Sequence, residues 1–213
     1  MLDAIPSLPV IATFSLAGII LAITPGPDMT LFLSRTLTNG RASGIASVLG
    51  ANVGCLVHTM LAVLGISALL ATSPTGFWLL KIIGAAYLVW LAAQAILHGS
   101  SLSLEPAQKS GSLWKDFAMG VGINILNPKV AIFFITFLPQ FVSADDPAAW
   151  KKMLFLGVYF VALSLPLVVA MVFAADGLAH TLRQNPRVTR VIDYVFATIF
   201  ATFAVKILLT EGR

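Results

Sequence analysis

Charge is scarce in this chain of 213 residues, since only 10% of them are Asp, Glu, Lys or Arg and 58% are hydrophobic. Soluble domains carry about 25% charged residues, so the composition excludes an ordinary soluble domain and is typical of an integral membrane protein. The single cysteine, Cys55, excludes an intramolecular disulfide framework. We interpret the formal net charge of +4 as a signal of membrane orientation and not of nucleic-acid binding.

Basic residues are also missing from the first segment, where no Lys or Arg precedes Arg35. A secretory signal peptide begins with a basic region, which this segment lacks. We therefore expect the first apolar segment to be a retained membrane span and not a cleaved peptide.

Apolar runs with few charges mark the candidate membrane spans, because about 20 apolar residues cross a bilayer as an α-helix. Six such runs lie at about residues 8–33, 42–70, 76–97, 117–141, 153–174 and 191–209. The longest polar connection, 98–115, is too short for a separate domain. We predict an all-α polytopic membrane protein of six transmembrane helices that forms one transport domain, residues 1–213. Its halves, 1–100 and 101–213, would be inverted three-helix repeats.

The repeat has weak support in the sequence itself. A shift of 101 positions places Pro27 on Pro128 and Asp28 on Lys129, but few other residues agree. Paired spans that proline or glycine interrupts at corresponding positions are nevertheless typical of a transporter binding site.

Basic residues are slightly more numerous on one side of the predicted membrane. That side holds Arg35, Arg41, Lys109, Lys115, Arg183, Arg187 and Arg190. The other side holds Lys81, Lys151, Lys152, Lys206 and Arg213. The positive-inside rule then predicts that both termini lie outside the cytoplasm.

Two proline-containing segments interrupt the first and fourth predicted spans. The first segment is Thr24, Pro25, Gly26, Pro27 and Asp28, and the second is Asn127, Pro128 and Lys129. Proline lacks an N–H group and clashes with the preceding turn, so neither segment continues a helix. We expect a half-helix ending near Ile23, with free carbonyl groups for a cation, and another beginning near Pro27, with free N–H groups for an anion.

Asp28 and Lys129 place opposite charges at these two breaks. A lone charge at the bilayer centre costs roughly 2.5–3.5 kcal/mol even on the mildest scale, so the two charges are expected to face each other. One interpretation is a buried ion pair that holds two kinked helices together. The other is a binding site for a zwitterion, whose ammonium group would meet Asp28 and whose carboxylate would meet Lys129.

Further polar residues lie within the predicted spans. Asn52 is either a cavity residue or a hydrogen-bond partner of a neighbouring helix, and Tyr159 is a candidate for contact with the substrate side chain. His58 is a candidate proton relay, although helix packing is the plainer role. Cys55 and His58 have a spacing of three, but two ligands do not make a metal site, so no metal and no cofactor are expected.

The chain resembles, over essentially its whole length, the lysine exporter/homoserine–threonine resistance family of bacterial amino-acid exporters. The resemblance is carried by three features. They are the Pro25-Gly26-Pro27 break, the Asn127-Pro128-Lys129 break, and the stretch Gly40-Arg41-Ala42-Ser43-Gly44 at the entry to the second span, which is rich in small residues and is followed by Gly50 and Gly54. It implies a multi-pass protein of the bacterial inner membrane that exports amino acids or related metabolites, driven by the proton gradient.

These features together predict a secondary active exporter with alternating access, and not an enzyme. The substrate is expected to be a neutral or hydroxylated amino acid, such as a threonine-like or homoserine-like one, because Asp28 is the one carboxylate identified deep in a span. Protonation of Asp28 would couple export to proton entry. A passive channel or facilitator and an intramembrane enzyme remain the alternatives. Small-residue helix faces would permit a homodimer.

Overall fold

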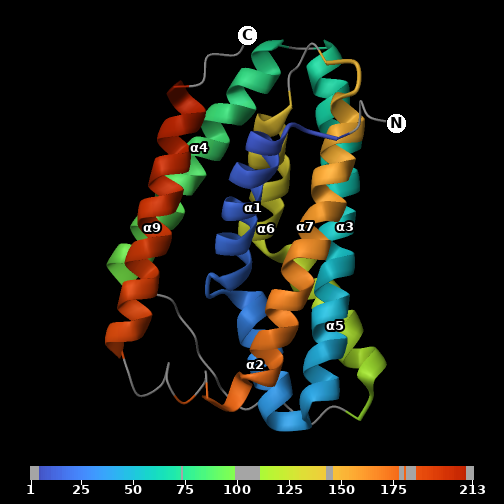
Figure 1. The fold of residues 1–213 in the computed structure, drawn as a ribbon, viewed down its shortest axis with the longest axis vertical. Helices are drawn as coiled ribbons and strands as arrows, with labels where there is room; N and C mark the ends of the chain where they lie inside the picture. Colours follow the sequence, from blue (N-terminus) through green and yellow to red (C-terminus); the bar gives the residue numbers. More distant parts are fainter. Residues whose placement is uncertain are drawn as a thin grey trace.

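The computed structural model describes residues 5–72, 74–98, 111–142, 146–177, 180 and 186–209. These residues form a bundle of helices without a strand (Figure 1). The helices are α1 (Leu8–Ile23), α2 (Pro27–Asn39), α3 (Arg41–Thr72), α4 (Pro74–His98), α5 (Leu113–Leu126), α6 (Pro128–Ile132), α7 (Ala149–Phe173) and α9 (Pro186–Leu209). A π-helical turn η2 (Phe133–Phe137) and a 3-10 turn η3 (Leu138–Phe141) continue α6.

Membrane-spanning length is reached in two ways. Residues Arg41–Gly65 of α3 and the whole of α7 are each apolar and long enough to cross a membrane alone. The α1–α2 pair and the pair formed by α5 with Pro128–Phe141 reach that length together, with bends of 52° and 56°. These bends confirm the predicted interruptions of the first and fourth spans. The described part of α4 adds a shorter apolar stretch, Ile82–Leu97, so the count of six spans and the inverted repeat stay predictions.

The two breaks form where the sequence places proline. Thr24 and Asn127 leave the helical conformation and adopt extended backbone, and Pro27 and Pro128 begin the next helices. Proline is favourable at that first helical position, because the missing N–H would have no partner there and the fixed φ suits a helix. The half-helices therefore end and begin where the sequence predicted, at Ile23 and Pro27.

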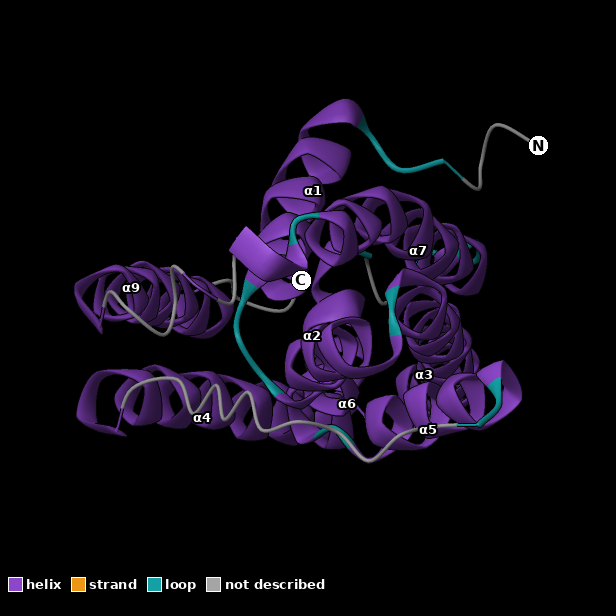
Figure 2. Ribbon diagram, turned by 90° about the horizontal axis from the view of Figure 1, so that it is seen from below, coloured by secondary structure: helices purple, strands orange, loops and turns teal. Residues whose placement is uncertain are grey.

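The helices divide into a main group and a flanking pair. Viewed along the bundle, α4 and α9 lie side by side at one edge, while the other helices surround α2 (Figure 2). Helix α3 packs along α5, α7 and α2, and α1 packs against α7. The flanking pair joins the main group through contacts of α4 with η2 and α3. Both helix breaks therefore lie within the main group.

Glycine allows a close helix contact between α3 and α5. A Cβ atom at Gly50 would overlap the backbone carbonyl oxygen of Phe117, and one at Gly120 would overlap that of Ser47. Two backbones approach this closely in a membrane only where side chains are absent. The small residues of the second predicted span thus serve close helix packing.

We predict that Gly120→Ala lowers the stability of the protein by about 1–3 kcal/mol, because the new methyl group must push the α3 backbone away. Thermal unfolding in detergent measures the change. Gly122→Ala is the matched control on the same helix, since a Cβ there meets nothing within 4 Å. Equal unfolding temperatures for the two variants would contradict the packing described here.

Candidate functional site

Lys129 joins the two helix breaks to each other. It lies in the first turn of α6, and its Nζ atom donates hydrogen bonds to the carbonyl oxygens of Thr24 at 3.0 Å and Leu21 at 3.4 Å. These carbonyl groups belong to the end of α1, where helical partners are missing. The free carbonyl groups expected at the end of the first half-helix thus accept hydrogen bonds from the lysine ammonium group.

Asp28 lies opposite, in the first turn of α2. Its Oδ2 atom accepts hydrogen bonds from the Nδ2 atoms of Asn127 at 3.0 Å and Asn124 at 3.1 Å. Its Oδ1 atom is buried and accepts no hydrogen bond from any residue in the described ranges. Two amides of the fourth span thus fix one oxygen of the carboxylate, and the other oxygen has no hydrogen-bond donor in the described ranges.

Asn127 has two roles, because both ends of its amide are used. Its Oδ1 atom accepts a hydrogen bond from the backbone N–H of Lys129 at 3.0 Å and so caps α6. Its Nδ2 atom donates to Asp28. The same side chain therefore starts the second half-helix and orients the carboxylate of the first break.

A cavity of about 50 Å³ lies between the breaks, with room for several water molecules. Its polar lining residues are Thr24, Asp28, Asn52, Asn124, Lys129 and Ser164. Apolar side chains of Phe32, Phe160 and Val168 complete much of the wall. Among the residues that line it, Asp28 and Lys129 alone carry formal charges, so the cavity is electrically balanced.

The sequence predicts a direct ion pair between Asp28 and Lys129, but among the described residues no ion pair joins them. The physical reason is that each charge has nearer partners of its own. Amide groups hold the carboxylate, and the carbonyl groups at the end of α1 hold the ammonium group. The expectation that the two charges pair directly, which both interpretations shared, is therefore wrong.

The other predicted site residues fall into three groups. Thr24 and Asn52 line the cavity, although the Asn52 amide also donates to the Val48 carbonyl oxygen at 2.8 Å. The backbone of the two breaks is shaped by Pro25, Gly26, Pro27 and Pro128. Tyr159 is not among the cavity residues, and its hydroxyl group lies 2.8 Å from the Ser15 hydroxyl.

His58 also lies outside the cavity lining. Its Nε2 atom lies 3.2 Å from the Asn124 carbonyl oxygen, and its ring stacks on Phe134 with 6.1 Å between the centroids. These contacts give it a role in packing α3 against the fourth span. The described residues include no group of three His, Cys, Asp or Glu side chains that could hold a metal ion.

Asn124 is a site residue that the sequence reasoning missed. It is 2% exposed, binds Asp28, and lies against Gly54, whose missing side chain makes room for it. A signal was present in the sequence, because Asn124 is a second asparagine in the apolar fourth span, only three residues before the break at Asn127.

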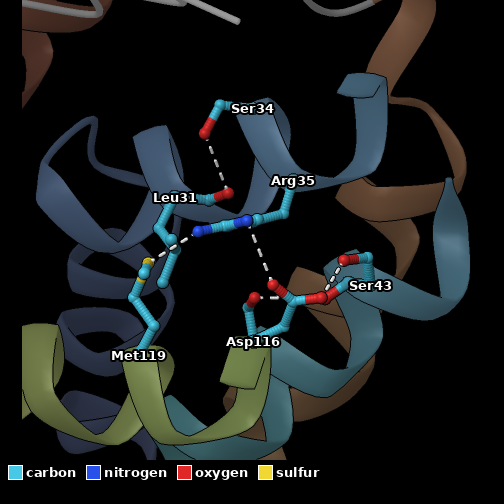
Figure 3. Close-up of polar contacts among 7 residues, drawn as sticks. Leu31, Ser34, Arg35, Ser43, Asp116 and Met119 are labelled. Atoms are coloured by element: carbon cyan, nitrogen blue, oxygen red, sulfur yellow. Dashed lines mark hydrogen bonds and ion pairs between the residues drawn. The ribbon is translucent and has the colours of Figure 1, made fainter. Parts of the chain in front are cut away.

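A second buried polar cluster lies outside the cavity and was also missed (Figure 3). Arg35 Nη1 of α2 lies 3.2 Å from Asp116 Oδ1 of α5, and the two side chains are 8% and 2% exposed. The hydroxyl group of Ser43, in the first turn of α3, donates to Asp116 Oδ2. The sequence predicts that Arg35 lies beyond the first span, on one side of the membrane, but it lies within α2 and is buried.

Comparisons with known proteins cover nearly the whole chain. A family model described as LysE type translocator matches residues 19–211. A homoserine/homoserine lactone efflux protein of Salmonella typhimurium is 25% identical over 94% of this chain and 95% of its own length. A leucine efflux protein of an Enterobacter species is 22% identical over 92% and 93%. An uncharacterized membrane protein of Vibrio cholerae is 29% identical over 88% and 90%. No solved structure matches.

We predict that Asn127→Ala destabilises the protein by about 1–2 kcal/mol through loss of the α6 cap. Asn127→Ser keeps a cap oxygen but has no amide to donate to Asp28, so most of the stability should return. Thermal unfolding of the two variants in detergent measures the difference. If Asn127→Ser were no more stable than Asn127→Ala, loss of the α6 cap would not explain the destabilisation.

Proposed function

Because the chain belongs to the LysE type translocator family, we propose that it exports a zwitterionic amino acid with a neutral side chain across the bacterial inner membrane. The observation that carries this proposal is the pair of separated opposite charges, Asp28 and Lys129, on the wall of one cavity. The relatives named for homoserine and leucine efflux support the amino-acid class.

The amino acid would bind between the two charges. Its ammonium group would donate to the unoccupied Oδ1 atom of Asp28. Its carboxylate would accept from Lys129 Nζ, which can exchange the carbonyl oxygens of Thr24 and Leu21 for a charged partner. Binding then leaves no buried charge unpaired, which is the condition for a charge inside a membrane.

Charge balance also limits the substrate side chain. A zwitterion adds no net charge to a cavity that already has one carboxylate and one ammonium group. A basic or acidic side chain would introduce a buried charge for which the described lining residues offer no partner. Asn52 and Ser164 could meet a hydroxyl group, and Phe32, Phe160 and Val168 an aliphatic one. The proposal therefore covers hydroxylated and neutral amino acids.

We propose further that Asp28 couples export to proton entry. The substrate ammonium group and a proton would compete for its carboxylate, so the amino acid and the proton would cross in opposite directions with alternating access. A passive facilitator is the alternative that needs no such competition. The positive-inside bias places the α2–α3 turn in the cytoplasm under this proposal.

Counterflow of radiolabelled amino acids in proteoliposomes, with and without an imposed pH gradient, tests this function. Threonine and homoserine should exchange, and the gradient should drive their accumulation against a concentration difference. Lysine should not compete, because its extra charge would stay unpaired. Flux that depends only on the amino-acid gradient would contradict proton antiport and favour a passive facilitator.

Asp28→Asn should lower transport by about 10- to 100-fold, because a hydrogen bond to a charged group contributes about 1.5–3 kcal/mol. The response to the pH gradient should disappear with it. Asp146→Asn is the control, because Asp146 lies between η3 and α7 and outside the cavity lining. Transport by Asp28→Asn at the normal rate with unchanged pH dependence would refute the assigned role.

A further inference from the structure

The contacts between α2 and α5 differ in kind from the other contacts of α2. Toward α3 and α7, α2 packs through apolar side chains, in a cluster that includes Leu31, Phe32, Val48 and Val168. Toward α5, where Ile123 packs on the same cluster, α2 also makes polar and sulfur contacts that cross between the two helices. These include Asp28 with Asn124, Arg35 with Asp116, and Arg35 with Met119.

These contacts form one continuous line, here named the α2–α5 seam and made of Asp28, Arg35, Asp116, Met119 and Asn124. On α2, Asp28 and Arg35 are seven residues apart, so they lie on one face about two turns from each other. Their partners on α5 run in the opposite order, so the two half-helices are antiparallel. The seam begins at the cavity and ends beside the α2–α3 turn, at the lower end of Figure 1.

We infer that the α2–α5 seam is the gate between the cavity and the α2–α3 side of the membrane, with the Arg35–Asp116 ion pair as its latch. This inference rests on the translocator role of the protein and not on which solute it moves. Figure 3 shows the latch, with Arg35 reaching from α2 to Asp116 and Met119 of α5.

A buried ion pair suits a gate because its closed and open states are close in free energy. In the closed state the attraction of Arg35 and Asp116 offsets the cost of removing both charges from water. In an open state each charge would regain its hydration. An apolar contact has no such compensation, because opening it exposes apolar surface to water.

Apolar side chains close the opposite side of the cavity. The two sides therefore differ in the kind of surface that opening would expose to water. Phe160 lines the cavity and packs on Phe133 with 5.6 Å between the ring centroids. Phe133 packs on Phe137, and Phe14 packs edge to face on Phe141. Opening this aromatic cluster would expose large apolar surfaces, whereas opening the α2–α5 seam exposes polar groups.

Cys55 provides a reporter for the gate without any engineering, because it is the only cysteine in the sequence. It lines the cavity, is 5% exposed, and its Sγ lies 3.7 Å from Asn124 Oδ1 at the inner end of the seam. A maleimide reagent reaches it only when the cavity opens. The rate of Cys55 labelling therefore measures how often a gate is open.

The experiment compares labelling of wild-type and variant proteins in membrane vesicles with an impermeant maleimide on the α2–α3 side. Arg35→Gln and Asp116→Asn should each raise the Cys55 labelling rate about tenfold, within the usual range for a shifted two-state equilibrium. Arg35→Lys keeps the charge and should leave the rate near that of the wild type. Lys152→Gln, which breaks the Lys152–Asp146 pair at the start of α7, is the matched control for loss of an ion pair.

A triple variant tests whether an apolar seam keeps the gate closed. It also keeps the inference testable if the charge-removing variants fail to fold. Arg35→Met with Asp116→Leu and Ser43→Ala replaces both members of the latch, and the hydroxyl group bound to Asp116, by apolar groups. Such a change often preserves or raises stability. It should seal the seam, so both Cys55 labelling from that side and transport should fall at least about tenfold.

The inference is overturned if folded Arg35→Gln and Asp116→Asn label at the wild-type rate, or if the triple variant labels and transports normally. The labelling outcomes are independent of the proposed substrate, because labelling needs no amino acid. Failure of counterflow with normal gating would reject the amino-acid proposal alone.

Discussion

The hydrogen bonds from the Lys129 ammonium group to the end of α1 are the interaction on which the rest of the site depends. A helix that ends inside an apolar region leaves carbonyl groups without partners, and hydrocarbon offers none. A lysine ammonium group in the same region is equally unfavourable alone. The ammonium group supplies the hydrogen-bond donor that the carbonyl groups lack, and the carbonyl groups supply its acceptors. Two breaks that would separately be costly are therefore stable together and enclose a polar cavity.

The cavity and the seam that leads from it depend on how α5 meets its neighbours. Against α3 it packs backbone to backbone at Gly50 and Gly120, a contact that tolerates little movement. Against α2 it offers the Asn124 amide and the Asp116 carboxylate, which can exchange their partners for water. One face of α5 is thus suited to stay fixed and another to separate, as the proposed gate requires.

Much of the fold and part of the site could be predicted, and the failures have a common cause. The breaks at Pro27 and Pro128 were predictable because proline acts on its own helix. The partners of Asp28 and Lys129 were not, because they lie about a hundred residues away in the sequence. Arg35 was assigned to a loop because its position near a predicted span end gives no sign of a buried carboxylate on another helix.

The sequence by itself determined that this chain is an apolar helical membrane protein with two interrupted spans, because composition and proline chemistry act locally. It also named the two charges that line the cavity. Only the tertiary structure decided that these charges are held apart, that Asn124 completes the site, and that Arg35 pairs with Asp116. A buried polar group takes whichever partner the packing brings within hydrogen-bond distance, and that distance is a property of the assembled helices.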